Sequence, residues 1–218
     1  AAYSRNREKV TLNTPLGGKI KRLFDIVISG TMLTLAIPII AIAGIGIRLQ
    51  DGGPAFYVHQ RVGYNRRPFN CLKLRTMSVS GELTMRRYLA ENPAARAEWD
   101  LTKKLKNDPR ITPLGRFLRK TSLDELPQLI NVLRGDMSIV GPRPVTYGEL
   151  NYYGSSSRHY FSARPGLTGL WQVSGRSDMD FSRRVVLDTF YVRRWKMSRD
   201  IVILSRTPVA VVRMSGSY

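Results

Sequence analysis

A stretch of 22 residues without a charged side chain, residues 26–47, most constrains how this chain can fold. It reads IVISGTMLTLAIPIIAIAGIGI and is bounded by Asp25 and Arg48. At a rise of about 1.5 Å per residue, a straight helix of this length would just cross the hydrocarbon core of a bilayer. The stretch therefore predicts a membrane-embedded helix.

Pro38 lies near the middle of this stretch and cannot donate an N–H to the helix, so we expect a break there. Both flanks are basic, with Arg5, Arg7, Lys9, Lys19, Lys21 and Arg22 before the stretch and Arg48, Arg61, Arg66 and Arg67 after it. The positive-inside rule keeps such residues on the cytoplasmic side, whereas a spanning helix would export one set. We therefore predict a re-entrant membrane helix over residues 19–48, broken near Pro38, which enters and leaves by the same face. A kinked transmembrane span and a signal peptide cleaved near residues 41–43 are the alternatives.

The charge of the chain points to phosphate as a ligand. The 218 residues include 35 Lys and Arg against 16 Asp and Glu, a formal net charge of +19, and 26 of the cations are arginine. Guanidinium groups bind phosphate and carboxylate oxygens through paired hydrogen bonds. Nucleic acid, an anionic membrane or a phosphorylated substrate are therefore the expected partners.

The inventory of reactive side chains excludes several common catalysts. Cys71 is the only cysteine, so the chain forms no internal disulfide, and His59 and His159 are the only histidines. These residues cannot assemble a zinc site. The sequence also contains neither a GxxxxGK[ST] phosphate loop nor a GxGxxG motif.

The remaining patterns predict an α+β protein, mainly helical, with a small β-hairpin. Residues 1–18 are polar and aperiodic, which predicts a flexible basic arm. Two strands are predicted over residues 55–63 and 68–76, joined by a turn. Helices are predicted within residues 82–106 and over 123–133, 183–195 and 198–214. Residues 49–218 would form a single cytoplasmic domain.

The last predicted helix has the character of an interfacial helix. Arg199, Arg206 and Arg213 recur every seven residues, nearly on one helical face, and Ile, Val and Leu fill much of the rest. A basic stripe beside a broad apolar face is typical of helices that lie at a membrane surface. A core helix with solvated arginines fits the same pattern equally well.

The densest group of charged residues surrounds Asp124 and Glu125. Ser122 and Glu125 have the spacing of a capping box, and carboxylates in the first turn of a helix are explained by the helix dipole alone. Several cations also lie nearby in sequence: Arg116, Arg119, Lys120, Arg134 and Arg143. An ionised carboxylate beside bound phosphate is suited to nucleophilic attack on phosphorus, and two adjacent acids suit a divalent cation.

Two loops hold arginines between prolines and glycines. They are GPRP, residues 141–144, and RPGLTGLWQVSGR, residues 164–176. Turn formation explains the prolines and glycines but not the recurring arginines. Fixed guanidinium groups would suit a nucleotide pyrophosphate.

Several long motifs, in a consistent order, resemble the bacterial sugar transferase family. The resemblance is greatest to its monotopic polyprenyl-phosphate phosphoglycosyl transferases that initiate exopolysaccharide synthesis, of the succinoglycan type. It extends from about Lys19 to the C-terminus. The motifs are KRLFDIVIS (21–29), the proline within the apolar stretch, KLRTM (73–77), LRKTSLDELPQLINVLRGDMSIVGPRP (118–144), RPGLTGLWQVSGR (164–176) and DTFYVRRW (188–195).

This resemblance implies a reaction. The chain would transfer hexose 1-phosphate, from UDP-glucose or UDP-galactose, to undecaprenyl phosphate with Mg²⁺ and would release UMP. Asp124 would attack the β-phosphate to form a phosphosugar-aspartyl intermediate, and Asp124 and Glu125 would share the metal. The family motifs also bring residues for substrate and phosphate binding to the site: Lys73, Arg119, Arg143, Arg176 and Asp200. The expected location is the cytoplasmic face of the bacterial inner membrane, with residues 49–218 as the catalytic domain and interfacial helices on membrane lipid.

One feature departs from the family pattern. Relatives often have Ser before the helix-breaking proline, whereas this chain has Ile37, so Thr34 is the expected donor to a carbonyl that Pro38 releases. A membrane-tethered nucleic-acid-binding module is disfavoured because the sequence shows neither a reading helix nor an aromatic platform. A non-catalytic membrane scaffold is the other alternative. The sequence leaves the identity of the hexose and the oligomeric state open, a homodimer included.

Overall fold

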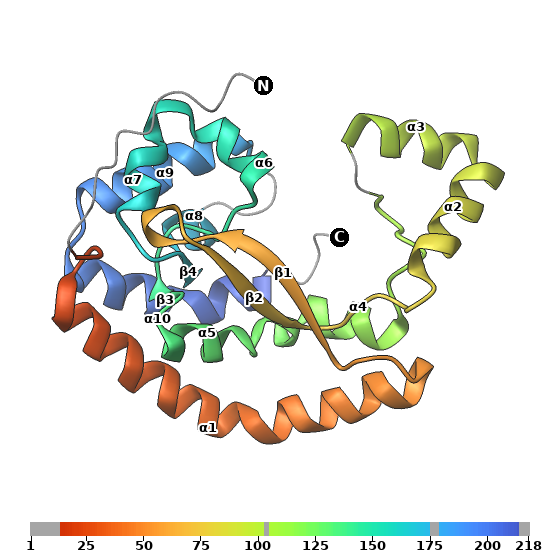
Figure 1. The fold of residues 1–218 in the computed structure, drawn as a ribbon, viewed down its shortest axis with the longest axis horizontal. Coiled ribbons are helices and arrows are strands. Elements are labelled where there is room, and N and C mark those ends of the chain that lie inside the picture. Colours follow the sequence, from red (N-terminus) through yellow and green to blue (C-terminus); the bar gives the residue numbers. More distant parts are fainter. Residues whose placement is uncertain (1–13, 103–104, 175–178, 214–218) are drawn as a thin grey trace.

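The computed structural model describes residues 14–102, 105–174 and 179–213. Helices dominate, as the sequence predicts, and Figure 1 shows them around two small sheets. The α-helices are α1 (Gly18–Asp51), α2 (Gly81–Glu91), α3 (Pro93–Thr102), α4 (Pro113–Lys120), α5 (Gln128–Arg134), α6 (Tyr147–Leu150), α7 (Ser157–Phe161), α8 (Leu170–Ser174), α9 (Phe181–Arg193) and α10 (Met197–Arg213). The strands are β1 (Phe56–Val62), β2 (Pro68–Leu74), β3 (Ser138–Val140) and β4 (Gly166–Thr168), and the 3-10 turns are η1 (Tyr64–Arg66), η2 (Leu123–Glu125) and η3 (Asn151–Ser156). Most of the predicted arm, residues 1–13, lies outside the described residues.

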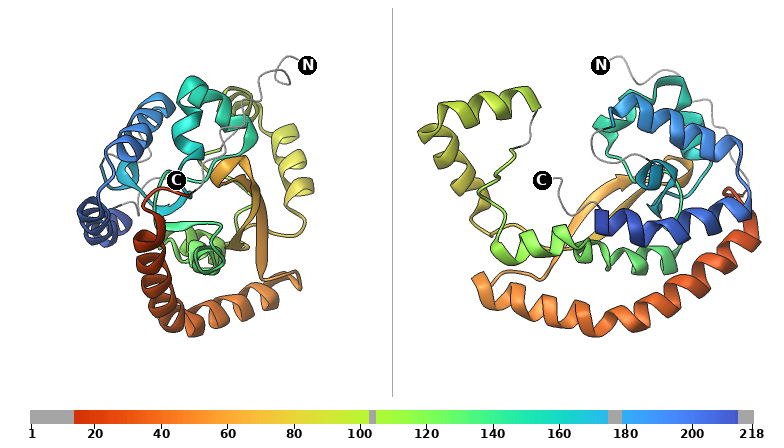
Figure 2. Two further views of the ribbon diagram at one scale, coloured as in Figure 1. Left: turned by 60° about the vertical axis from the view of Figure 1, so that its left-hand side comes forward. Right: turned by 180° about the vertical axis from the view of Figure 1, so that it is seen from behind.

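The long apolar stretch forms one helix, α1, which continues through Pro38. The expected interruption is therefore a bend, and Figures 1 and 2 show α1 bowed beneath the body of the protein. Pro38 removes one N–H from the helix, and hydroxyls before it bond back to carbonyls four residues earlier, from Ser29 to Asp25 and from Thr34 to Gly30. Both features bend helices. The Thr34 hydroxyl thus bonds Gly30 and not the carbonyl that Pro38 releases.

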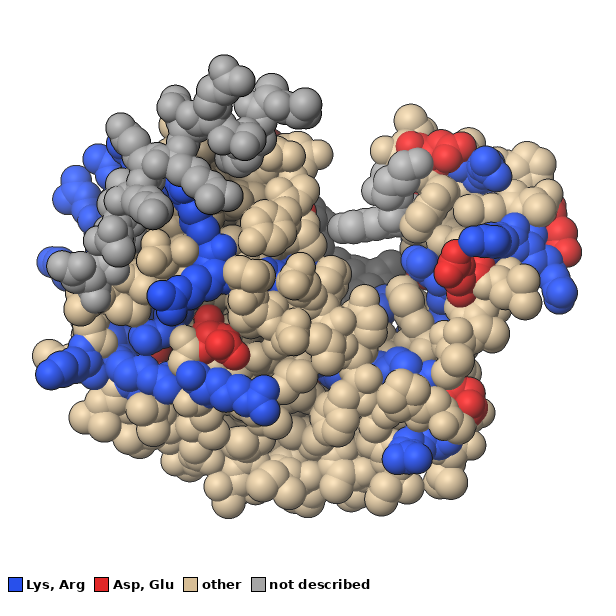
Figure 3. All heavy atoms as spheres, in the orientation of Figure 1, with Lys and Arg blue, Asp and Glu red and all other residues tan. Residues whose placement is uncertain are grey.

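The outer side of α1 is apolar and uncovered. Leu35, Ile42 and Leu49 are 71%, 72% and 82% exposed. Within the described residues, α1 is the one helix whose length and composition would allow it to cross a membrane. Figure 3 shows the surface formed by α1, at the bottom of the view, with few charged side chains, whereas Lys and Arg gather above the end where α1 begins.

Buried polar contacts fix the first turns of α1 to the rest of the protein. The Arg22 guanidinium donates to the carbonyls of Val132 and Leu133, at 2.6 and 2.7 Å, near the end of α5. The Lys21 ammonium lies 2.6 Å from the Asp200 carboxylate of α10. Since a helix leaves its last carbonyls without internal partners, Arg22 satisfies groups that would otherwise be unpaired. The start of α1 and the end of α5 are therefore held together.

The predicted hairpin is confirmed. β1 and β2 are antiparallel, with a register that runs from Phe56 opposite Leu74 to Val62 opposite Pro68. Arg61 lies opposite Phe69, four pairs away from the pair that contains Lys73 and on the same face, because side chains alternate along a strand. The second sheet pairs β3 with β4 in parallel and was not predicted, since three-residue strands show no usable alternation.

The C-terminal helix, α10, packs against the core on one side and leaves apolar residues exposed on another. Ile203 of α10 is 1% exposed and belongs to the main core, together with residues of α5, β3 and α9. The same helix leaves other apolar residues exposed, namely Ile201, Val202, Val209 and Val212. In contrast, α2 and α3 project away from the body, as Figures 1 and 2 show, and contribute little to the main core.

Candidate active site

The adjacent carboxylates Asp124 and Glu125 lie in a single 3-10 turn, η2, between α4 and α5. The sequence predicted a continuous helix over residues 123–133 that begins with a capping box, and this prediction is wrong. Ser122 has a left-handed backbone conformation, φ 57°, and in the described structure its side chain makes no capping hydrogen bond. Pro127 then separates the turn from α5. The capping box fails because the Glu125 carboxylate binds a residue that is distant in sequence.

That residue is Lys73, near the end of β2. Its ammonium donates to Glu125 Oε1 at 2.6 Å and lies 3.9 Å from Asp124 Oδ2. Asp124 is 8% exposed and Glu125 is half-buried. One cation therefore serves two carboxylates, and the closer contact goes to Glu125.

The two carboxylates have opposite pKa shifts. Burial, together with the neighbouring Glu125 charge, raises the pKa of Asp124 to about 6, against the opposing effects of Lys73 and Arg119. Burial would also raise the pKa of Glu125, but Lys73 and then Arg143 outweigh it and hold that pKa below its ordinary value. Adjacent acids whose pKa values are pushed apart are typical of sites where one acid reacts and the other stabilises charge. Asp124 is the poorly stabilised member of the pair.

The residues that follow Lys73 position a second cation of the site. Arg119, on α4, donates from Nε to the Thr76 hydroxyl at 2.8 Å. The Thr76 carbonyl accepts from the Thr112 amide at 3.1 Å, at the start of α4. A Cβ on Gly115 would lie 2.0 Å from this carbonyl oxygen, so only glycine permits the close approach. The backbone at residue 76 thus holds α4, and with it Arg119, against the strand.

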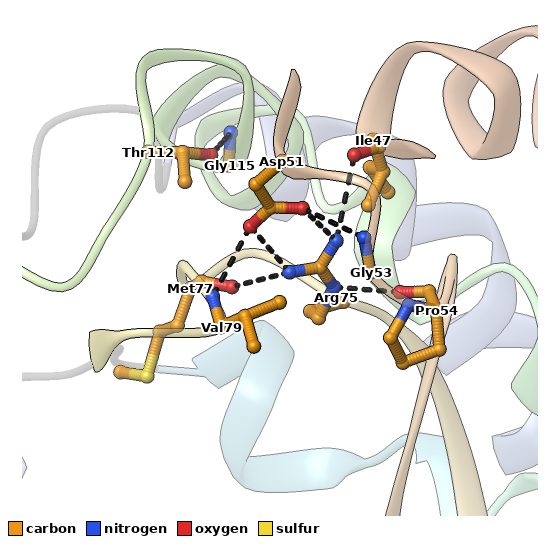
Figure 4. Close-up of polar contacts among 9 residues, drawn as sticks. All are labelled: Ile47, Asp51, Gly53, Pro54, Arg75, Met77, Val79, Thr112 and Gly115. Carbon is orange, nitrogen blue, oxygen red and sulfur yellow. Dashed lines mark hydrogen bonds and ion pairs between the residues drawn. The ribbon is translucent and has the colours of Figure 1, made fainter. Parts of the chain in front are cut away.

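Arg75 lies between Lys73 and Thr76 in the sequence. Its guanidinium binds the end of α1 and not the pair Asp124 and Glu125, which we call the dyad. Figure 4 shows its guanidinium enclosed by the Asp51 carboxylate and the backbone oxygens of Ile47, Pro54 and Met77. Nη1 donates to Asp51 Oδ2 at 2.6 Å, and Nη2 donates to Asp51 Oδ1. We call this group the Asp51–Arg75 clamp. It fixes the last turn of α1 to the end of the strand that carries Lys73.

Arg143 approaches the dyad from the loop after β3. Its charge contributes to the low pKa of Glu125, and its guanidinium lies 5.8 Å from the centre of the Trp171 ring. Arg61 of β1 is a further cation at the site, since it also lowers the pKa of Glu125. The Glu149 carboxylate holds Arg61 at 2.9 Å. The positive charges around the dyad therefore come from four separate elements.

Sequence reasoning missed two of these groups. It treated Arg61 only as a flanking charge, although the alternation of the predicted hairpin places Arg61 and Lys73 on one face. Trp171 was taken only as part of a loop motif, whereas the structure places it on α8, 3% exposed and beneath Arg143. No local signal pairs Trp171 with Arg143, because 28 residues separate them in the sequence.

The remaining predicted site residues have other positions. Arg176 lies outside the described residues. Asp200 is fully buried and binds Lys21 of α1, the Tyr191 hydroxyl at 2.7 Å and the Trp195 indole N–H at 3.0 Å. These contacts join α10 to α1 and α9. The structure thus brings together Lys73, Arg119, Asp124, Glu125 and Arg143 but gives Asp200 a different set of partners.

The donor set for a metal is small. Across residues 14–102, 105–174 and 179–213, no group of three His, Cys, Asp or Glu side chains is placed to hold an ion. Asp124 and Glu125 are the two carboxylates at the site. Mg²⁺ is commonly held by one or two carboxylates while phosphate oxygens and water complete its coordination. The pair therefore fits Mg²⁺ that arrives with a phosphorylated substrate.

The chain is similar to several named bacterial proteins over nearly its whole length. A family model described as bacterial sugar transferase matches residues 17–214. The exopolysaccharide production protein ExoY of Sinorhizobium fredii is 48% identical over 204 residues, which cover 94% of this chain and 90% of that protein. The undecaprenyl-phosphate galactose phosphotransferase of Salmonella typhimurium is 51% identical over 199 residues, 91% of this chain but 42% of that protein. The UDP-glucose:undecaprenyl-phosphate glucose-1-phosphate transferase of Caulobacter vibrioides is 37% identical over 206 residues, 91% of this chain and 72% of that protein.

Proposed function

Because the chain belongs to the bacterial sugar transferase family, we propose that it transfers hexose 1-phosphate from a UDP-sugar to undecaprenyl phosphate and releases UMP, an early step of exopolysaccharide synthesis. It is a phosphoglycosyl transferase, as its named relatives are. The proposed mechanism rests on one observation, the difference in pairing and pKa between Asp124 and Glu125. Asp124 is buried and has a raised pKa, whereas Glu125 is neutralised by Lys73.

The proposed chemistry proceeds in two displacements at phosphorus. An Asp124 carboxylate oxygen attacks the β-phosphorus of the UDP-sugar and forms a new P–O bond. The bond from that phosphorus to the oxygen bridging the two phosphates breaks, and this oxygen leaves with UMP. A phosphate oxygen of the lipid then attacks the same phosphorus and expels the Asp124 carboxylate. The product is a lipid diphosphate that carries the hexose, and the enzyme is regenerated.

The environment of Asp124 suits this role. The Lys73 ammonium lies 3.9 Å from the Asp124 carboxylate but 2.6 Å from that of Glu125. A buried carboxylate that is only weakly paired is a stronger nucleophile than one in a close ion pair, and the raised pKa of Asp124 reflects this poor stabilisation of its charge. Because this pKa lies below 7, Asp124 is mostly ionised at neutral pH. Lys73 and Arg119 supply positive charge where negative charge accumulates on the phosphates. Glu125 keeps the Lys73 ammonium in place.

We propose Mg²⁺ as the cofactor, held by Asp124 and Glu125. When bound, the ion would neutralise charge on the incoming diphosphate and so allow an anionic nucleophile to approach. Two carboxylates are enough for a Mg²⁺ site whose remaining ligands are phosphate oxygens of the substrate and water. Activity should therefore be lost with a chelator and restored by added Mg²⁺.

We further propose that the protein lies on the cytoplasmic face of the bacterial inner membrane, with α1 re-entrant. The exposed apolar side of α1, its bend and the basic residues on both flanks support this arrangement. The lipid acceptor would then reach the dyad from the membrane plane. Single cysteines at Thr14 and Gln50, in a Cys71→Ala background, test the topology. A re-entrant helix exposes both to reagent from the cytoplasmic side, whereas a spanning helix exposes them on opposite sides.

The activity is tested by UMP release. Purified protein, undecaprenyl phosphate and Mg²⁺ are incubated with a panel that includes UDP-glucose and UDP-galactose. We expect UMP with one hexose, loss of this activity in Asp124→Asn and full activity in Asp100→Asn, a matched change at an exposed aspartate. If folded, lipid-reconstituted protein releases no UMP with any sugar, the enzyme assignment is wrong and a non-catalytic scaffold takes its place.

A further inference from the structure

The face of the hairpin that carries Lys73 also carries two rings that the proposed mechanism does not use. In the antiparallel register, Tyr57 of β1 lies directly opposite Lys73, and His59 lies opposite Cys71. Directly opposed residues point to the same face of a sheet, with Cβ atoms about 5 Å apart, and every second residue of a strand shares that face. Tyr57 and His59 therefore lie beside the ammonium that pairs with both carboxylates of the dyad.

His59 lies between two of the cations that surround the dyad. Burial and then the charge of Arg61 lower the pKa of His59, Lys73 lowers it further, and Glu149 opposes them. Lys73 and Arg61 also lower the pKa of Glu125, so both cations lie near the same carboxylate. Because a histidine with a lowered pKa is neutral at neutral pH, the site holds an uncharged imidazole between two charged groups.

Arg61 also determines which ring nitrogen of His59 carries the proton. The Glu149 carboxylate holds the Arg61 guanidinium through Nη1 at 2.9 Å, and Nη2 of the same group lies 3.2 Å from His59 Nδ1. A guanidinium can only donate, so Nδ1 is the acceptor and the proton of the neutral ring is on Nε2. His59 is thus a neutral N–H donor in a fixed orientation.

Tyr57 adds an amphipathic surface next to this donor. Its side chain is 51% exposed, and its ring meets the His59 ring edge to face, with centroids 6.0 Å apart and an interplanar angle of 70°. The phenol combines an apolar ring face with a hydroxyl that can both donate and accept. A hexose has C–H groups on its ring and neutral hydroxyls around it. Neutral hydrogen-bonding groups and an aromatic face complement such a ligand, whereas the neighbouring cations complement phosphate.

The hexose is also the part of the donor that lies nearest to these rings. In a UDP-hexose, one oxygen atom joins the hexose to the β-phosphorus that Asp124 attacks, whereas the uracil lies beyond the α-phosphate and the ribose. We propose that Tyr57 and His59 bind the hexose of the UDP-sugar through the Tyr57 hydroxyl and the His59 Nε2–H, and that they select which hexose is transferred. This inference rests on the proposed function for its substrate. Glucose and galactose differ in the orientation of one hydroxyl, and a site built to hydrogen-bond a hydroxyl rejects a ligand that lacks it there.

Binding measurements test the inference without reference to turnover. Affinities for UDP-glucose, UDP-galactose and UDP are measured by calorimetry with the full chain in nanodiscs that contain no lipid acceptor. All proteins carry Asp124→Asn, so that the UDP-sugar is not consumed. The variants are Tyr57→Phe, His59→Phe and His59→Gln. Tyr152→Phe on η3 and His159→Phe on α7 are the matched controls, and thermal midpoints establish that each variant is folded.

We expect the starting protein to bind one UDP-hexose more tightly than the other. Tyr57→Phe and His59→Phe should each reduce the ratio of the two affinities by about fivefold to tenfold, the effect of one lost hydrogen bond, and should change the affinity for UDP by less than about twofold. His59→Gln should recover part of the ratio, because its amide also donates. Both control variants should keep the original ratio.

Three results would overturn the inference. They are equal affinities of the starting protein for the two UDP-hexoses, a ratio that neither Tyr57→Phe nor His59→Phe changes more than the controls do, and an equal loss of affinity for UDP and for the UDP-hexoses, which would assign the rings to the nucleotide. The proposed function is judged separately by UMP release. A failure of that assay would leave a hexose-dependent difference in affinity intact.

Discussion

The chain builds two clusters of basic and acidic side chains from one short segment, residues 73–77, and they differ in how completely their charges are satisfied. In the Asp51–Arg75 clamp, one guanidinium meets one carboxylate, and backbone oxygens and amides take the remaining hydrogen bonds. At the dyad, one ammonium meets two carboxylates, and the nearer contact goes to Glu125. The Asp124 carboxylate has the longer of the two contacts with Lys73, and it is buried beside the like charge of Glu125.

The pKa values express this difference. Hydrogen bonding from Arg75 holds the pKa of Asp51 far below its ordinary value, whereas burial raises that of Asp124 to about 6. A structural ion pair stabilises the charged form, and a reactive carboxylate is kept where its charge is poorly stabilised. Residue type alone does not distinguish the two clusters. They differ in direct contact, because Arg75 donates to the Asp51 carboxylate at 2.6 Å, whereas the Lys73 ammonium lies 3.9 Å from Asp124. The following predictions test this comparison.

The largest expected effect is the loss of turnover in Asp124→Asn. An amide cannot form the intermediate, so we expect UMP release to fall by about a thousandfold or more. The contrast is Asp51→Asn, which removes a carboxylate of the clamp and should reduce turnover only severalfold. Steady-state rates of both variants, at equal amounts of folded protein, measure the effect. Similar losses in the two variants would show that the clusters do not have separate roles.

The next effect concerns Lys73. The activity of the wild-type protein should fall about tenfold for each pH unit below about 6, because the nucleophile must be ionised. Lys73 lowers the pKa values of both Asp124 and Glu125. Lys73→Gln should therefore move the acidic limb of the pH–rate profile upward by about 1 pH unit and reduce the rate at neutral pH. Lys196→Gln, a change at an exposed lysine, is the control, and an unshifted limb in Lys73→Gln would contradict the assignment.

Breaking the clamp should cost stability more than it costs chemistry. Arg75→Gln leaves the Asp51 carboxylate and several backbone oxygens without their donor, so we expect the thermal midpoint to fall by about 5 °C. Arg86→Gln is the matched control, since Arg86 pairs with Glu82 at an exposed site with side chains 76% and 81% exposed. Equal midpoints for the two variants would show that the clamp is dispensable. Hydrogen exchange at the Val79 amide, which donates to Asp51, follows the same opening locally.

The smallest effect concerns how the stability of the folded protein depends on pH. Ionisation of Asp124 and ionisation of Asp51 should change the stability in opposite directions. The folded-state pKa of Asp124 is raised, so the folded protein loses stability as pH rises from about 3.8 to about 6. Asp124→Asn should therefore raise the thermal midpoint by a few degrees at pH 7 but not at pH 4. The pKa of Asp51 is lowered, so its contribution is present above about 3.8 and is lost as pH falls. Asp51→Asn should lower the midpoint at pH 7, and the deficit should shrink in acid. Parallel pH dependence in the two variants would remove the distinction.

Much of this organisation could be predicted from the sequence, and the failures have physical causes. The hairpin was predictable because alternation and turn residues are local signals, and the dyad was predictable from its motif. The capping box at Ser122 failed because Glu125 binds Lys73, which is 52 residues away, and long-range ion pairs override local capping. The break at Pro38 became a bend because back-bonding hydroxyls and one missing N–H deform α1 without ending it. Trp171 was missed because its contact with Arg143 depends on the tertiary fold.

The central claim is that Asp124 forms a covalent bond to the phosphosugar, and mass spectrometry tests it most directly. The wild-type protein is mixed with its UDP-hexose and Mg²⁺ in the absence of lipid acceptor, quenched in acid and digested. We predict a burst of UMP of at most one equivalent and a hexose-phosphate adduct on the peptide that contains Asp124. The adduct should disappear when undecaprenyl phosphate is added before the quench. Lipid-dependent UMP release without any adduct, or an adduct on another residue, would contradict the account.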